Sequence, residues 1–188
     1  MSIKYFGSSI VSEETISVVI PCLNEEATIA SCIEKVRRVF SEKDLKGEVL
    51  VVDNGSDDRS VAIARQCGAR VIVQPLRGYG AAYLKGIEES RGDIVVMGDG
   101  DNTYDFNEMP KLLAALGATV DFVIGSRFRG AIKKGAMSFS HRYIGNPILT
   151  AILNLFFRSR ISDAHSGFRA IRRQALAKLH MKTTGMEF

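Results

Sequence analysis

The sequence predicts an α/β fold in which a mostly parallel sheet is covered by helices. Short runs rich in β-branched residues alternate along the chain with longer segments whose apolar residues recur at helical spacing. Several of the short runs are apolar at nearly every position, as expected for strands that are buried on both faces. This alternation is typical of βαβ units, so we expect parallel strands with helices on both faces of the sheet.

The predicted elements follow one another in a regular order. Five segments are predicted strands, at residues 16–20, 49–53, 70–73, 93–97 and 122–125. Four segments are predicted helices, at residues 26–40, 58–66, 81–90 and 107–116. A polar stretch at residues 130–135 is predicted to be a mobile loop. Because ligands of such folds bind beyond the carboxyl ends of the strands, we expect the chemistry to lie there.

A fifth helix is predicted over Pro147–Phe157. Asn146 is a good N-cap, and proline suits the first helical position. The helix is apolar nearly all round, so it is either a buried core helix or a segment that lies in a membrane interface. Arg142, Arg158 and Arg160 flank it and would reach lipid phosphates in the second case.

Composition excludes several classes of protein. The chain has 188 residues, of which 46% are hydrophobic and 24% are charged. This is enough apolar material for a core and too much charge for a membrane bundle. The three cysteines have no metal-binding spacing, which indicates reduced thiols in a cytosolic setting.

The net charge of +4 hides two halves of opposite sign. Residues 1–124 hold 13 Lys and Arg against 19 Asp and Glu, whereas residues 125–188 hold 12 against 2. The basic part is expected to attract phosphate groups. Nucleic acid is disfavoured as the partner because few stacking aromatics accompany the basic residues and no nucleic-acid motif is present.

Three predicted strands end in polar segments, at residues 21–26, 53–58 and 98–102. These residues are either turn and N-cap residues or ligands of a bound molecule. Asp99 and Asp101 flank a glycine after a buried strand, and their mutual repulsion favours a cation between them. Carboxylate oxygens together with substrate phosphates are typical ligands of Mg²⁺, and this pair suits Mg²⁺ or Mn²⁺ on a diphosphate.

Glycines at positions 78 and 80 open the third helix, where backbone amides are able to bind phosphate. The segment lacks the Gly-Lys-Ser/Thr of a P-loop, and nothing glycine-rich follows the first strand. A nicotinamide enzyme and a nucleotidyltransferase are therefore disfavoured. A non-catalytic nucleotide-binding module remains open.

Four motifs, in order and at suitable spacing, make the chain resemble a family 2 glycosyltransferase. Residues 18–26, VVIPCLNEE, are similar to the motif VVIPxxNEE, and residues 51–58, VVDNGSDD, are similar to VVDDGSxD. Residues 99–101, DGD, stand where the family has its Asp-x-Asp metal motif, and residues 163–169, DAHSGFR, resemble DxxSGFR. The branch most similar is that of the dolichyl- and polyprenyl-phosphate sugar synthases.

The chain also departs from the family pattern. Asn54 stands where the second motif often has another aspartate, and residues 102–104 replace a common Leu/Gln-containing stretch, which leaves the donor sugar open. The family normally continues beyond the position of Phe188, so the resemblance implies a further catalytic segment and a membrane anchor in a longer protein.

The resemblance implies the GT-A fold, a Rossmann-like three-layer arrangement with a mostly parallel central sheet. Residues 1–124 would form the nucleotide-sugar-binding half and residues 125–188 the acceptor-side half of one catalytic domain. It further implies an inverting transfer from a UDP or GDP sugar, with Asp99 and Asp101 holding Mg²⁺ or Mn²⁺. The nucleotide-sugar-binding residues are expected to be Pro21, Leu23, Asn24, Glu25, Asp53, Gly55, Gly80, Lys85, Asp99 and Gly100.

The same resemblance assigns roles on the acceptor side. The catalytic residues are expected to be Asp101, Asp163, Arg127 and Arg169. The acceptor phosphate is expected to bind Arg127, Arg142 and Ser166. The acceptor would be an isoprenoid phosphate at the cytoplasmic face of a membrane, and that acceptor needs no base because it is already anionic.

The alternative acceptor is a hydroxyl of a polysaccharide or glycan. Such a hydroxyl must lose a proton, and Asp163 is then the candidate base. The other role considered for Asp163 is to orient Arg169 or to cap a turn. His165 is the one histidine that lies within a motif.

Overall fold

The computed structural model describes residues 14–117, 119–126, 146–158, 161–164, 166–186 and 188. Strands are β1 (Ile16–Cys22), β2 (Gly47–Asp53), β3 (Arg70–Val73), β4 (Ile94–Met97), β5 (Phe122–Ile124) and β6 (Arg169–Arg172). Helices are α1 (Ile29–Glu42), α2 (Ser60–Gln66), α3 (Tyr79–Glu89), α4 (Met109–Leu116), α5 (Asn146–Phe157) and α6 (Arg173–Leu176), with a 3₁₀ turn η1 (Phe106–Glu108). The predicted segment 130–135 lies outside the described residues.

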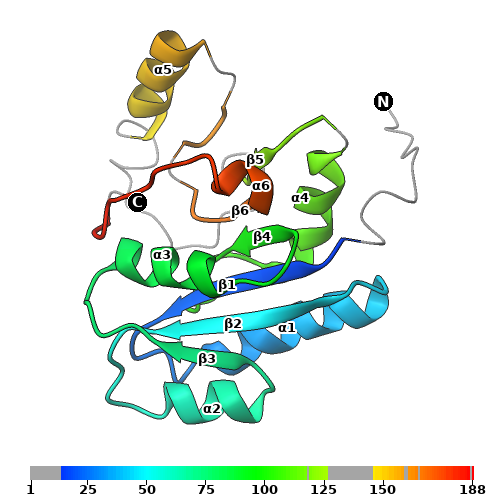
Figure 1. Ribbon diagram of the computed structural model, residues 1–188, viewed down its shortest axis with the longest axis vertical. Helices are drawn as coiled ribbons and strands as arrows, with labels where there is room; N and C mark the ends of the chain where they lie inside the picture. The colour runs from blue at the N-terminus through cyan, green and yellow to red at the C-terminus, as the bar shows by residue number, and fades with distance from the viewer. Residues whose placement is uncertain (1–13, 118, 127–145, 159–160, 165, 187) are drawn as a thin grey trace.

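The strands form one sheet in the order β3-β2-β1-β4-β6-β5 (Figure 1). β1 pairs in parallel with β2 and β4, and β2 pairs in parallel with β3. β6 lies between β4 and β5 and runs antiparallel to both. The mostly parallel sheet is confirmed, and β6 is a strand that the periodicity did not predict. With only four residues, two of them arginines at its ends, it lacks a recognisable strand pattern.

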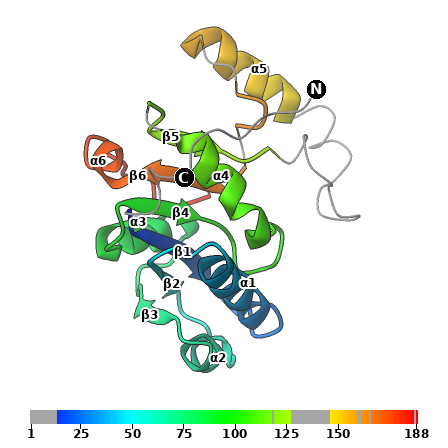
Figure 2. The ribbon, with the colours of Figure 1, turned by 90° about the vertical axis from the view of Figure 1, so that its right-hand side faces the viewer.

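Helices lie on both faces of the sheet (Figure 2), and an apolar cluster packs on each face. On one face, alternate residues of β1 and β2 pack against α1, α2 and α4; on the other, the intervening residues pack against α3 and α6. Because strand side chains alternate between faces, the fully apolar strands supply both clusters at once. This three-layer arrangement brings the carboxyl ends of β1, β2 and β4 to one edge of the sheet.

Helix α5 lies apart from the sheet (Figures 1 and 2). Its side chains Leu155, Phe156 and Phe157 are each more than three-quarters exposed, and Ile148 and Leu149 are at least half exposed. Within the described part of the chain, α5 is therefore not a buried core helix. Within the part of the chain that the structure describes, no helix is both long enough and apolar enough to span a bilayer.

Candidate active site

The loops after β1 and β2 are joined to each other by side-chain hydrogen bonds. The Asn24 amide donates to Ser56 Oγ (3.0 Å), and Asn24 Oδ1 accepts from the Asp57 amide (2.9 Å). The Glu25 amide donates to Ser60 Oγ (2.7 Å). Asn24 has a φ of 59°, a left-handed conformation that asparagine tolerates better than most residues. The two predicted loops thus form one surface.

Asp53 organises the loop that follows β2. It is nearly buried, and its two carboxylate oxygens accept from the amides of Gly55 (3.3 Å) and Ser56 (3.1 Å). Gly55 has a φ of 95°, which favours glycine. Next to this loop, Pro21 is partly exposed and Leu23 is 43% exposed at the end of β1. An apolar surface beside a fixed carboxylate suits a nucleoside.

Asp99 and Asp101 follow β4 in different surroundings. Asp99 is half-buried, and its Oδ1 accepts hydrogen bonds from the hydroxyls of Tyr79 (2.8 Å) and Tyr83 (3.1 Å). Asp101 is exposed, and its oxygens accept from the amide and hydroxyl of Thr103 (2.7 and 2.8 Å). Gly100, between them, is buried against Ile20 and Ile29 side chains.

Negative charge accumulates at this edge. Burial raises the pKa of Asp99, and the neighbouring Asp101 raises it further, against the opposing hydrogen bonds from the tyrosines. Burial also raises the pKa of Glu25, with contributions from the charges of Asp101, Asp58 and Asp99. Both shifts have the direction expected for partly buried carboxyl groups close to like charges, and a bound cation would oppose them.

The carboxylates fit a hard divalent cation as part of a larger ligand set. Among the described residues, no group of three or more His, Cys, Asp or Glu side chains is placed to hold a metal ion. Mg²⁺ and Mn²⁺ prefer oxygen ligands and commonly share their coordination between one or two carboxylates and substrate phosphates. Asp99 and Asp101 match that requirement.

Three amides at the start of α3, those of Gly78, Gly80 and Ala81, are bonded within the chain. The amides of Gly80 and Ala81 donate to the carbonyls of Gly185 and Thr184 (3.0 Å each), and the Gly78 amide donates to Asn54 Oδ1 (2.8 Å). The Gly80 amide is thus bonded within the chain, and binding of the donor by Gly80 stays a prediction that this contact does not support. The two glycines instead allow the backbone of residues 183–185 to lie against the helix.

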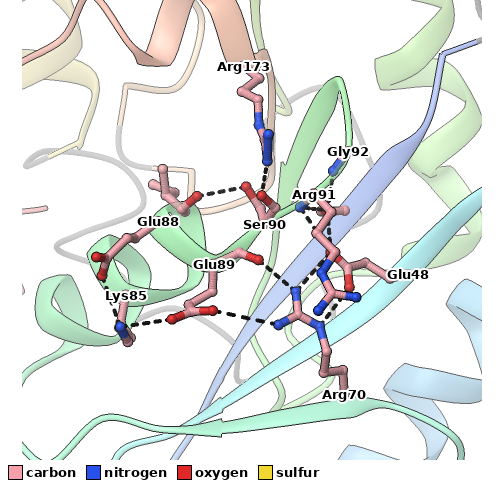
Figure 3. A network of polar contacts seen from close by, with 11 residues as sticks. Glu48, Arg70, Lys85, Glu88, Glu89, Ser90, Arg91, Gly92 and Arg173 are labelled. Atoms are coloured by element: carbon pink, nitrogen blue, oxygen red, sulfur yellow. Dashed lines mark hydrogen bonds and ion pairs between the residues drawn. The ribbon is translucent and has the colours of Figure 1, made fainter.

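Lys85 also lies away from the other predicted residues. Its ammonium pairs with Glu88 and Glu89 (3.0 Å each) on the last turns of α3, in a network that includes Arg70 at the start of β3 (Figure 3). The amino end of β3 is at the opposite edge of the sheet from Asp99. Binding of the nucleotide sugar by Lys85 stays a prediction, which these ion pairs do not support.

The Ser166–Arg169 segment enters β6 beside Asp99. Arg169 pairs with Met97, two residues before Asp99, and its guanidinium donates to the carbonyls of Ser166 (2.8 Å) and Phe188 (3.3 Å). These are the hydrogen bonds that the structure gives for the Arg169 guanidinium, and the role of Asp163 stays a prediction. Asp163 and Ser166 are buried. Arg127, Arg142, Arg160 and His165 lie outside the described residues.

Three tyrosines of the site were not predicted. Tyr79 and Tyr83 bind Asp99, while Tyr104 accepts a hydrogen bond from the Gly167 amide (2.7 Å) and stacks on Phe168. Burial raises the pKa of both Tyr79 and Tyr83 above its usual value, as does the charge of Asp99, so both remain hydroxyl donors at neutral pH. The four-residue spacing of the first two was a signal of a shared helix face.

The comparisons with known proteins agree with this arrangement. The model of glycosyl transferase family 2 matches residues 17–179. The chain belongs to glycosyl transferase family 2. The resemblance inferred from the four motifs is thus confirmed.

Several curated relatives come from archaea. The chain is 47% identical over 175 residues to the low-salt glycan biosynthesis hexosyltransferase Agl6 of Haloferax volcanii, an alignment that covers 93% of this chain and 42% of the relative. It is 35% identical over 164 residues to the dolichyl-phosphate hexose transferase of the same organism, covering 87% and 68%. The dolichol-phosphate mannosyltransferase of Pyrococcus furiosus is 27% identical over 178 residues, covering 92% and 50%. The family 2 chain thus spans between 42% and 68% of these relatives.

Solved structures confirm the predicted GT-A fold. Glucosyl-3-phosphoglycerate synthase from Mycobacterium tuberculosis with phosphoglyceric acid has a TM-score of 0.74 and 30% identity, covering 93% of this chain and 62% of that one. The same enzyme with Mn²⁺ and UDP-glucose has a TM-score of 0.69 and 30% identity, covering 89% and 59%.

Proposed function

We propose that the full protein is an inverting glycosyltransferase that moves a sugar from a UDP or GDP sugar to a polyprenyl phosphate. The observation that carries the proposal is the half-buried Asp99 beside Asp101, at the edge where the loops of β1 and β2 meet. Family membership supports sugar transfer, and two relatives are by name dolichyl- or dolichol-phosphate transferases.

On the donor side, Leu23, Asn24 and Asp53 would contact the nucleoside, and Asp99 and Asp101 would hold Mg²⁺ or Mn²⁺. When bound, the divalent ion neutralises charge that develops on the departing nucleoside diphosphate. The solved relative that contains both Mn²⁺ and UDP-glucose supports this assignment.

On the acceptor side, a phosphate oxygen of the lipid would attack the anomeric carbon of the sugar. The new carbon–oxygen bond would form on the face opposite the bond to the diphosphate. That second bond would break, and the nucleoside diphosphate would depart with its electron pair. The configuration at the anomeric carbon would therefore invert. A phosphate is already anionic at neutral pH, so positioning replaces a general base. Arg169 beside Asp99 supports phosphate binding, and Arg127 and Arg142 are proposed to act with it.

The burial of Asp163 favours the phosphate acceptor over a hydroxyl acceptor. Asp163 has no exposed surface, whereas a general base must come within hydrogen-bond reach of the hydroxyl proton. We therefore expect the full protein with Asp163→Asn to bind nucleotide and still transfer sugar to a polyprenyl phosphate. The measurement is transfer of labelled sugar from UDP and GDP sugars to a polyprenyl phosphate, in comparison with a glycan hydroxyl acceptor.

A matched control for this substitution is Asp121→Asn, which changes an exposed aspartate before β5. Asp163→Asn could abolish sugar transfer while its nucleotide binding and melting temperature match those of Asp121→Asn. In that case Asp163 acts as a base, and the hydroxyl acceptor is favoured over the phosphate acceptor. If neither kind of acceptor is glycosylated by the wild-type full protein, the proposed activity is wrong.

Helix α5 supports a membrane-bound acceptor. The exposed side chains of Leu155, Phe156 and Phe157 form an apolar end of the helix, directly before Arg158. Apolar side chains next to a basic residue suit the boundary between acyl chains and anionic head groups. We place the reaction at the cytoplasmic face of the membrane, because the free cysteines are typical of a reducing compartment.

The membrane contact is testable with vesicles. Burying a large apolar side chain contributes about 1.5–3 kcal/mol, so replacing Leu155 and Phe156 by serine should weaken binding to anionic phospholipid vesicles by about tenfold or more. The measurement is co-sedimentation with vesicles. Leu179→Ser, at an exposed apolar residue outside α5, is the control and should bind as the wild type does. Equal binding of all variants would contradict a role for α5.

A further inference from the structure

Two tyrosines of α3 converge on one oxygen of Asp99. The hydroxyls of Tyr79 and Tyr83 donate to Asp99 Oδ1 over 2.8 and 3.1 Å. Because the two residues are four positions apart, they lie on one face of the helix. Their rings meet edge to face, with centroids 4.9 Å apart. Both hydroxyls thus act on the same carboxylate oxygen from one rigid element.

The second oxygen of Asp99 is left for another ligand. No described residue donates a hydrogen bond to Asp99 Oδ2. Gly167 faces this oxygen, since a Cβ atom added to Gly167 would lie 3.3 Å from Oδ2 and 3.1 Å from the Tyr79 hydroxyl. A glycine at this position therefore keeps the space beside Oδ2 open.

The tyrosine pair is itself held in place. Tyr83 is 1% exposed, and its ring stacks on Phe188 with centroids 5.4 Å apart and planes 6° apart. The first turn of α3, which carries Tyr79, is bonded to the carbonyls of Thr184 and Gly185. Packing on two sides fixes the direction from which the hydroxyls reach Asp99.

We infer that Tyr79 and Tyr83 are positioning residues that orient Asp99 so that Oδ2 faces a divalent cation on the donor diphosphate. The inference rests on the proposed function, because it assigns a task to the metal-binding carboxylate. Hydrogen bonds to an ionised oxygen are stronger than neutral ones, and two of them on Oδ1 fix the rotation of the carboxylate. Removing a residue that hydrogen-bonds to a metal ligand typically lowers metal affinity by about 10- to 100-fold.

The test uses Tyr79→Phe, Tyr83→Phe and the double variant. Phenylalanine keeps each ring and removes only the hydroxyl that reaches Asp99. We expect Mn²⁺ affinity in the presence of UDP or GDP to fall by about tenfold in each single variant and further in the double variant. Calorimetry measures the affinity, and electron paramagnetic resonance measures the environment of bound Mn²⁺. Binding of nucleotide without metal should not change.

A double-mutant cycle separates positioning from general stability. If the tyrosines act through Asp99, their replacement in an Asp99→Ala background should cause no further loss of Mn²⁺ affinity. The control is Ser17→Ala, which removes a buried hydroxyl bonded to Glu48 (2.8 Å) at the opposite edge of the sheet. Ser17→Ala should lower the melting temperature without changing Mn²⁺ affinity.

The outcomes are distinct. If wild-type protein binds Mn²⁺ with nucleotide and the phenylalanine variants bind it equally well, the positioning role is overturned and the proposed function stands. A loss that persists in the Asp99→Ala background also overturns it, because the tyrosines then act elsewhere. If the wild type shows no metal-dependent nucleotide binding, the proposed function fails, and the inference fails with it.

Discussion

Asn54 determines how the loop before α3 lies against the end of β2. Its side-chain amide donates to the carbonyls of Gln74 (2.9 Å) and Leu76 (2.8 Å), and its Oδ1 accepts from the Gly78 amide (2.8 Å). An aspartate would have no N–H groups for the two carbonyls. The asparagine that departs from the family motif is thus explained by the loop it binds.

We predict that Asn54→Asp lowers the free energy of unfolding. The new carboxylate would face two carbonyl oxygens in a buried place, and a buried polar group that loses its partner costs about 1–3 kcal/mol. Urea denaturation measures the change. The control is Asn24→Asp, because Asn24 uses its side-chain oxygen as an acceptor, which aspartate retains. Equal stability of Asn54→Asp and Asn24→Asp would contradict this account.

At the scale of elements, the packing of residues 183–185 on α3 requires their backbones to lie close together. A Cβ atom at Gly80 would lie 2.4 Å from the Thr183 carbonyl oxygen and 2.9 Å from the Thr184 carbonyl carbon. Alanine normally stabilises a helix relative to glycine, by about 0.5–1 kcal/mol. At position 80 the clash with backbone atoms opposes that gain.

We therefore predict that Gly80→Ala destabilises the protein, by about 1–3 kcal/mol, the usual cost of overpacking. The displaced segment would also release the Ala81 amide from Thr184, so hydrogen exchange at Ala81 should become faster. Denaturation and amide exchange measure the two effects. Unchanged exchange at Ala81 would show that the segment does not depend on Gly80.

A second group of elements is joined by Glu48 at the amino edge of the sheet (Figure 3). Glu48 on β2 accepts two bonds from Arg70 on β3 (2.8 and 3.1 Å), one from Ser17 on β1 (2.8 Å) and one from the Arg91 amide (3.0 Å). Arg70 also donates to the carbonyl of Glu89 on α3 (2.7 Å). The Glu48 carboxylate thus links three strands, and Arg70 extends the link to α3.

This carboxylate makes stability depend on pH. Burial alone would raise the pKa of Glu48, but the bonds from Arg70, Ser17 and the Arg91 amide outweigh burial and lower it. A lowered folded-state pKa stabilises the fold above the unfolded value of about 4.3, and the contribution is lost as the pH falls through the folded value. We predict that Glu48→Gln costs about 1–3 kcal/mol at neutral pH and less below about pH 4.

Denaturation of both proteins across this pH range measures the difference. The control is Glu42→Gln at an exposed glutamate that ends α1, which should leave stability nearly unchanged at every pH. A cost of Glu48→Gln that stays constant down to acid pH would show that the charge of Glu48 is not what stabilises this edge.

At the scale of the whole molecule, periodicity and turn chemistry predicted the parallel strands, their helices and the edge where the loops meet. These features depend on local patterns, such as the apolar runs of β1 and β2 and the polar residues that follow them. Contacts between distant segments have no local pattern. The bonds from Thr184 and Gly185 to α3 and the convergence of Tyr79 on Asp99 therefore became visible only in the fold.

The acidic and basic parts of the sequence can be partly located in the fold. Acidic residues of the first 124 positions gather at the ends of β1 and β4, where burial and the charge of Asp101 raise the pKa of both Glu25 and Asp99. Arg169, from the basic part, enters the sheet beside them on β6. A cation bound to the carboxylates and a diphosphate facing Arg169 would balance the negative charge of the one and the positive charge of the other.

The most direct test of the account is calorimetric titration of UDP and GDP with and without Mn²⁺. We predict that Mn²⁺ strengthens the binding of at least one nucleotide, and that Asp99→Ala combined with Asp101→Ala abolishes this gain while Asp121→Asn preserves it. The carboxylates at the end of β4 would then be the metal-binding residues. If neither nucleotide binds, or if the double variant keeps the full effect of Mn²⁺, the assignment of this edge as the donor site is contradicted.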